Sequence, residues 1–211
     1  MNAVYMYDDF VARTFEPFAL TRPISEMLAG IELVRARWSV AAGGDGAARA
    51  FIGAPHLVHF DEAGAPRALA SDAIVPTGAI VANSRFVVAL GQSLRDTDSI
   101  WQCGGRICAV RLAQPLHVSR LADGSLTLDQ FVRQDGDGDR GGSEIPGRWI
   151  DAVWDYIATL SLQLAEDISE AAAALEADPL HRDSLPASTA VMGSHAVTVE
   201  RGATIEPYVV L

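Results

Sequence analysis

Two adjacent carboxylates follow the first apolar run of the chain. Residues 3–7 (AVYMY) are rich in β-forming side chains, and Asp8 and Asp9 come directly after them. This pattern predicts a buried strand with acidic residues at its carboxyl end. Ligands of open α/β sheets bind beyond the carboxyl ends of the strands, so both are candidates for contact with a metal or substrate. The alternative is that they are only the polar end of a strand.

The next candidates, Thr21 and Arg22, lie in a loop. Pro17 and Pro23 interrupt any long helix in this segment. Arginine offers a planar, permanently charged fork that suits phosphate oxygens, and loops carry a large share of binding residues. We therefore expect Arg22 to contact an anion, with Thr21 beside it.

Asn83 and Arg85 separate two apolar runs within residues 73–90. An amide and a guanidinium at this point could bind substrate. They could equally form a turn with a solvated arginine, and the sequence leaves both alternatives open.

Composition narrows the function. The chain has 211 residues, 27 acidic and 16 basic, with a net charge of −11, so nucleic-acid binding is a poor hypothesis. All the basic residues are arginine, which excludes a lysine nucleophile or base. No apolar run is long enough to span a membrane, and Asp8 and Asp9 interrupt any signal peptide. With Cys103 and Cys108 expected to be reduced, we predict a cytoplasmic protein.

The apolar spacing predicts an α/β protein. A helix is expected over residues 24–38, and hairpins over 101–112 and 116–128, where Gly-Gly and Asp-Gly separate β-like segments. A long helix is expected over 149–177, with Asp151 and Asp155 in its first turn.

Two polar features carry weaker signals. Asp135, Asp137 and Asp139 imitate the start of an EF-hand loop, but Pro146 stands where the bidentate carboxylate is required, so we expect a solvated loop. His195 is interpreted as a surface residue, although a catalytic base is the alternative.

The last twenty residues repeat every six positions. One apolar column is Val199, Ile205 and Leu211, and a second one runs through Val191, Val197, Ala203 and Val209. The period favours a left-handed parallel β-helix over a hairpin. Because such solenoids need several stacked units and caps, we expect the chain to be a fragment or a natural truncation.

Segments from both ends of the chain, taken together, resemble the sequences of a known family. The matching segments are YDD (7–9), PFALTRP (17–23), ISEMLAGIELVRARW (24–38), VANSRF (81–86), GGRICAVRL (104–112), VWDYI (153–157) and the hexapeptides from 191. The chain resembles the amino-terminal part of the alternative bacterial bifunctional N-acetylglucosamine-1-phosphate uridylyltransferase/glucosamine-1-phosphate acetyltransferase family.

The resemblance implies a fold and its partners. It implies a nucleotidyltransferase-like (Rossmann-like) mixed sheet flanked by helices over 1–178, a linker over 179–190, and the start of a left-handed β-helix over 191–211. The implied reaction joins a sugar 1-phosphate to a nucleoside triphosphate with Mg²⁺. Acetyl-CoA would serve only the missing acyltransferase part, and the full-length form would be a homotrimer.

Within that implied site, Arg22 and Asp9 would be catalytic. The substrate would be bound by Asp8, Thr21, Asn83 and Arg85. The sequence lacks the G-x-G-T-R-M loop and the lysine of better-known pyrophosphorylases, and Asn83 stands where they have a metal-binding Asp. The rival hypothesis is therefore a catalytically degenerate domain that binds a nucleotide sugar or supports a trimeric β-helix.

Overall fold

The computed structural model describes residues 2–44, 48–135, 142–175, 178–179, 185–194 and 196–211. The chain divides into two compact units, Met1–Gln163 and Leu164–Leu211, and each is described by itself. Asp137, Asp139 and His195 lie outside the described residues. In the described part of the chain, no helix has the length and apolar character that crossing a membrane requires.

A seven-stranded mixed sheet organises the first unit. Its strand order is β12-β9-β10-β7-β1-β4-β5. The strands are β1 (Val4–Tyr7), β4 (Ala50–Ile52), β5 (Arg67–Ala68), β7 (Ile80–Asn83), β9 (Ile100–Cys103), β10 (Arg106–Arg111) and β12 (Ser143–Glu144). β1 pairs in parallel with both β4 and β7, whereas β10 is antiparallel to β7 and β9. The predicted α/β class with a mixed sheet is confirmed.

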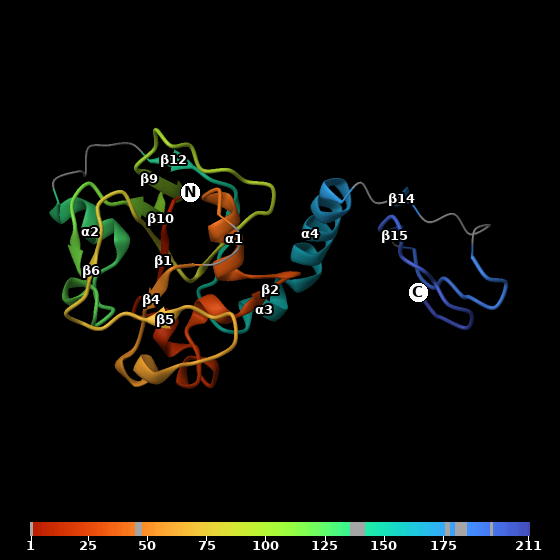
Figure 1. Ribbon diagram of the computed structural model, residues 1–211, viewed down its shortest axis with the longest axis horizontal. Coiled ribbons are helices and arrows are strands. Elements are labelled where there is room, and N and C mark those ends of the chain that lie inside the picture. Colours follow the sequence, from red (N-terminus) through yellow and green to blue (C-terminus); the bar gives the residue numbers. More distant parts are fainter. Residues whose placement is uncertain (1, 45–47, 136–141, 176–177, 180–184, 195) are drawn as a thin grey trace. The chain divides into compact units, whose positions relative to one another are not determined.

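Each face of the sheet has its own core because strand side chains alternate between the faces. Val4 and Met6 of β1 belong to a core that includes α1 (Val34–Ala41), whereas Tyr7 belongs to a second core that includes α2 (Leu128–Gln134). Figure 1 shows β1, β9 and β10 between these two helices. The first strand is therefore buried on both sides, as its apolar run predicts.

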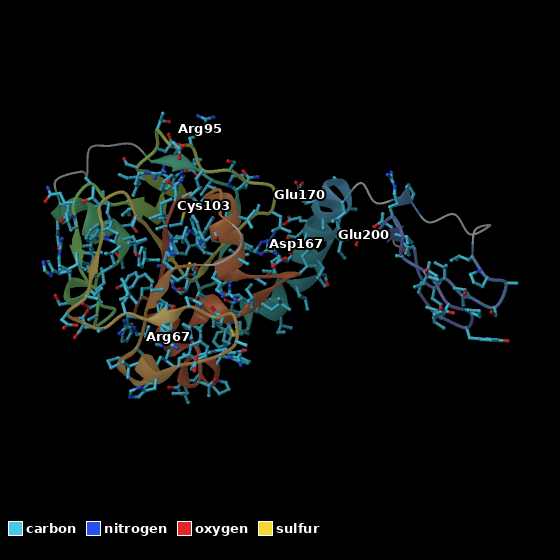
Figure 2. All side chains as sticks on the ribbon, viewed as in Figure 1. Arg67, Arg95, Cys103, Asp167, Glu170 and Glu200 are labelled. Carbon is cyan, nitrogen blue, oxygen red and sulfur yellow. The ribbon has the colours of Figure 1, made fainter. Side chains whose placement is uncertain are left out.

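Short elements surround the sheet. The 3₁₀ helices are η1 (Ala12–Thr14), η2 (Phe18–Leu20), η3 (Ile24–Glu26), η4 (Pro55–His59) and η5 (Val118–Arg120). Two-stranded pairs are formed by β2 (Leu28–Ala29) with β3 (Glu32–Leu33), by β6 (Ile74–Val75) with β11 (Leu116–His117), and by β8 (Phe86–Val88) with β13 (Gly147–Trp149). Arg67, labelled in Figure 2, is an exposed charge on the edge strand β5, a placement that discourages edge-to-edge pairing.

The predicted helix over residues 24–38 is wrong in its first half. η3 and the β2–β3 pair occupy residues 24–33, and Gly30 turns between these strands with a φ of 66°. That conformation is open to glycine and strained for other residues. Leu28 is consequently exposed, whereas Ile24, Val34 and Trp38 are buried as the periodicity requires.

Of the two predicted hairpins, one is confirmed and the other is wrong. The hairpin over 101–112 is confirmed as β9–β10, with Gly104 and Gly105 both at positive φ. The hairpin over 116–128 is wrong, because β11 pairs with β6 from a distant part of the chain.

The long helix over 149–177 is also wrong at its start. Trp149 ends β13, and the helical residues form α3 (Asp155–Ala158) and α4 (Leu160–Ala174). Asp155 does lie in a first helical turn, whereas Asp151 precedes α3.

In the second unit the described segments form only short backbone pairings with one another. β14 (Asp178–Pro179) is antiparallel to β15 (Thr198–Val199), and a parallel bridge joins Ala190 to Val210. The described residues show no β-helix, so that part of the expected fold stays a prediction.

Candidate functional site

The candidate site lies where three parallel strands end. Tyr7, the last residue of β1, is in register with Ile52 at the end of β4 and with Asn83 at the end of β7. The backbone N–H of Asp8 donates to the Ile52 carbonyl at 2.9 Å. The carboxyl edge of the sheet therefore brings Asp8, Asp9 and Asn83 together, as the first-strand pattern predicts.

Asp9 is held by hydrogen bonds on both of its oxygens. Arg85 donates from Nε to Oδ1 at 2.9 Å and from Nη2 to Oδ2 at 2.7 Å. The Ala12 N–H donates to Oδ1 and the Asn83 amide to Oδ2, each at 2.9 Å. Burial acts to raise the pKa of Asp9, but the hydrogen bonds and charge of Arg85 outweigh it and hold that pKa below its ordinary value. Asp9 is thus a buried structural anchor.

Arg85 connects that anchor to a distant segment. Its Nη1 donates to the Asp151 carboxylate at 2.7 Å and to the Ile150 carbonyl at 3.2 Å. The same carboxylate accepts from Arg106, whose guanidinium lies 3.9 Å from the centre of the Trp149 ring. Arg85 is only 4% exposed, so it is not the solvated turn residue that the sequence allowed.

Asp8 has the opposite environment. It is 2% exposed, and its Oδ2 accepts from the Ile24 N–H at 3.2 Å. Its Oδ1 is buried and has no hydrogen-bond partner among the described residues. Burial raises the pKa of Asp8 from 3.8 to about 6. Of the two acidic residues, Asp8 is therefore the one with an open bonding position.

Arg13 is a cation that the sequence reasoning missed. Its Nε donates to the Asp8 carbonyl at 3.0 Å and its Nη1 to the Ala122 carbonyl at 2.9 Å, while Nη2 is buried without a hydrogen-bond partner in the described part of the chain. Gly124 lies against the guanidinium so closely that a Cβ there would be 2.7 Å from Nε. The available signal was that Arg13 is the first arginine after the strand, in the same loop as Arg22.

Thr21 and Arg22 lie apart from this network of bonds. The Thr21 hydroxyl is exposed and donates to the Phe18 carbonyl at 3.2 Å. Arg22 Nη2 lies 3.7 Å from Glu62, with both side chains well exposed. No hydrogen bond or ion pair described for the chain joins Arg22 to Asp8 or Asp9. The same segment nevertheless contacts the site through its backbone, because the N–H of Ile24, two residues after Arg22, donates to Asp8.

The donor set does not form a protein-built metal cage. Among the described residues, no group of three or more His, Cys, Asp or Glu side chains could hold a metal ion. Both Asp9 oxygens already accept hydrogen bonds, which leaves Asp8 Oδ1 as the open carboxylate oxygen at this edge. The Mg²⁺ implied by the resemblance therefore does not fit a site made by these residues alone.

The cysteines contribute no site. Cys103, labelled in Figure 2, and Cys108 are both free thiols, in agreement with the expected reduced pair. Burial raises the pKa of each thiol, which lowers its reactivity.

Comparison with known proteins assigns the chain to a family. The family model for sugar nucleotidyl transferases matches residues 4–174, which include the sheet, Asp8, Asp9, Arg13, Asn83 and Arg85. No curated protein matches the chain, and no solved structure matches it. Since the match covers most of the sequence, the chain belongs to the sugar nucleotidyl transferase family.

Proposed function

We propose that this protein transfers a nucleotidyl group from a nucleoside triphosphate to a sugar 1-phosphate. A phosphate oxygen of the sugar attacks the α-phosphorus, the bond to the β-phosphate oxygen breaks, and pyrophosphate leaves. Such a reaction depends on positioning and on neutralising charge. The family match supports this reaction class, and the open oxygen of Asp8 at the carboxyl edge of β1 is the structural observation that carries the placement of the site.

The residues of the edge would have different roles. Asp9 and Arg85, with Asn83, are positioning residues that fix the ends of β1 and β7. Arg13, whose Nε donates to the Asp8 carbonyl, has an Nη2 without a hydrogen-bond partner among the described residues, and this group suits a phosphate oxygen. Thr21 and Arg22 would bind the anionic substrate from the loop, after Arg22 leaves Glu62.

The finer substrate assignment rests on the resemblance. It favours a uridine nucleotide and N-acetylglucosamine 1-phosphate, as in a UDP-N-acetylglucosamine diphosphorylase. Mg²⁺ would be supplied with the triphosphate.

The test is the release of pyrophosphate by the purified protein. Each of the four common nucleoside triphosphates is incubated with N-acetylglucosamine 1-phosphate and Mg²⁺, and glucose 1-phosphate is run in parallel. Turnover is expected with one triphosphate, and it should fall at least a hundredfold in Asp8→Asn. Absence of turnover with every pair would overturn the catalytic proposal.

A second function is favoured by the state of Asp9. Because Asp9 is paired with Arg85, Oδ1 of Asp8 is the one oxygen of the two carboxylates without a hydrogen-bond partner among the described residues. The chain also has no lysine. Both features fit a catalytically degenerate domain that binds a nucleotide sugar or supports a β-helix. Thermal stabilisation by UDP-N-acetylglucosamine without turnover supports the binding domain, and no stabilisation by any nucleotide leaves the scaffold.

We further propose that residues 191–211 begin a left-handed parallel β-helix. Ala190 pairs in parallel with Val210, with the Leu211 N–H donating to the Ala190 carbonyl at 2.9 Å. A chain that returns to pair in parallel with itself after twenty residues is consistent with one solenoid turn. A homotrimer and an acetyl-CoA-dependent acyltransferase are the corresponding proposals. Sedimentation of the full-length protein as a monomer would contradict the trimer.

A further inference from the structure

Three buried polar atoms without partners surround the end of β1. They are Oδ1 of Asp8, Oγ of Ser84 and Oη of Tyr156, each without a hydrogen-bond partner in the described part of the chain. The three residues are 2%, 0% and 9% exposed. Leaving a buried polar atom unpaired is unfavourable, so a group of them at the candidate site requires an explanation.

The fold brings these residues to one face of the sheet. Asp8 and Ser84 directly follow Tyr7 and Asn83, which are in register, and the Ser84 N–H donates to the Tyr7 carbonyl at 2.9 Å. Their side chains therefore emerge side by side, and the nearby Ser84 hydroxyl opposes the rise that burial causes in the pKa of Asp8. Tyr156 packs in the same core as Met6 of β1 and as Ile24, whose N–H donates to Asp8, so its phenol lies on the same face of the sheet. Burial, and then the negative charge of Asp8, raise the pKa of that phenol.

The chemistry of the three atoms selects a neutral ligand. The ionised Asp8 oxygen only accepts hydrogen bonds, whereas the Ser84 and Tyr156 hydroxyls can both donate. A hydroxyl group matches this set, since its proton faces the carboxylate and its lone pairs face the two donors. A phosphate oxygen does not match, because the buried carboxylate would repel it.

We propose that Asp8, Ser84 and Tyr156 form a binding site for a single hydroxyl group at the carboxyl edge of the sheet. Water occupies it in the free protein, and a hydroxyl of the sugar 1-phosphate takes its place in the complex. A buried water with three polar partners is an ordinary feature of proteins. The assignment of the sugar hydroxyl rests on the proposed function, whereas the water does not.

Access for the sugar depends on Tyr156. It lies on α3, a helix of four residues, and its ring contacts Phe15 edge-on with centroids 6.5 Å apart. Asp155 ties the start of α3 to the preceding loop by accepting from the Asp151 and Ala152 N–H groups at 2.9 Å. These hydrogen bonds hold the start of α3 to the loop that precedes it.

The test compares a sugar phosphate with a sugar-free anion. Isothermal titration measures binding of N-acetylglucosamine 1-phosphate and of inorganic phosphate to wild type, Tyr156→Phe and Ser84→Ala. Each substitution removes one hydroxyl from the site, so affinity for the sugar phosphate should fall roughly tenfold, with affinity for inorganic phosphate unchanged. Tyr7→Phe is the matched control, since it removes a buried phenol that donates instead to the Leu126 carbonyl. It should change neither affinity.

The outcomes separate this inference from the transfer reaction. Equal losses for both ligands, no loss for either, or no binding of N-acetylglucosamine 1-phosphate by wild type would overturn the sugar-hydroxyl site. Selective loss in a protein that releases no pyrophosphate would support the hydroxyl site and contradict the catalytic proposal. Pyrophosphate release that is unchanged by both substitutions would support the catalytic proposal and contradict the hydroxyl site. Two different variants guard against a folding defect in one of them.

Discussion

Asp8 and Asp9 are consecutive residues with opposite electrostatic environments. Both are 2% exposed, yet Asp9 accepts hydrogen bonds from Arg85 on both of its oxygens, while Oδ1 of Asp8 has no partner among the described residues. The pKa of Asp9 is lowered and that of Asp8 is raised to about 6. Environments that shift the pKa values of two neighbouring carboxyl groups in opposite directions usually give these groups different roles. Here Asp9 stabilises the fold and Asp8 is available for function.

Asp8→Asn should therefore increase stability at neutral pH. The Asp8 carboxyl titrates near 3.8 in the unfolded chain and near 6 in the folded protein, so the folded state binds more protons between these values. Wild-type stability falls as the pH rises through this window, by up to about 3 kcal/mol. Urea unfolding from pH 3 to pH 8 should show the variant more stable at pH 7, with the difference shrinking below about pH 4. A variant less stable than wild type at pH 7 would contradict this account.

Asp9→Asn should have the opposite effect. The pKa of Asp9 is depressed, so its contribution to stability is complete above its unfolded value of 3.8 and is lost as the pH falls through the folded pKa. At pH 7 the substitution leaves Arg85 buried with a weakened partner, which should cost about 3 kcal/mol in urea unfolding. Arg106→Gln is the control, since Arg106 contacts Asp151 from a 40% exposed position and should cost less than about 1 kcal/mol. Similar losses in the two variants would remove the structural role of Asp9.

The sequence predicted β1, which carries the site, more accurately than it predicted the elements around β1. An apolar run followed by two acidic residues identifies β1 and its polar end, because both depend on local side-chain types. The pairing of Asp9 with Arg85 was not predictable in this way, since it spans 76 residues and depends on the parallel register of β1 with β7. The helix over 24–38 failed for a related reason. Gly30 adopts a turn that spacing alone does not reveal.

Arg22→Ala tests the loop that the sequence singled out. The Arg22–Glu62 pair is exposed and its atoms are 3.7 Å apart, so its loss should change the free energy of unfolding by less than about 1 kcal/mol. Nucleotide binding should nevertheless be abolished, as measured by titration calorimetry with UTP. Glu62→Gln is the matched control, because it breaks the same pair but retains the cation. Unchanged UTP affinity in Arg22→Ala would leave Arg13 as the candidate phosphate ligand.

Gly124→Ala tests whether the position of Arg13 matters for function. Gly124 has a φ of 78°, and an added Cβ would lie 2.7 Å from Arg13 Nε and 2.8 Å from Cζ, so the guanidinium must move. Gly64→Ala is a control with the same φ of 78° and no atom within 4 Å of the added Cβ. Gly64→Ala should lose about 1 kcal/mol of stability from backbone strain, and Gly124→Ala should lose more, because it also disturbs the hydrogen bonds of Arg13 to the Asp8 and Ala122 carbonyls. Only Gly124→Ala should reduce pyrophosphate release, by at least tenfold, because only there is the cation beside Asp8 displaced. Equal activity in the two variants would show that Arg13 holds the loop in place without contributing to the reaction.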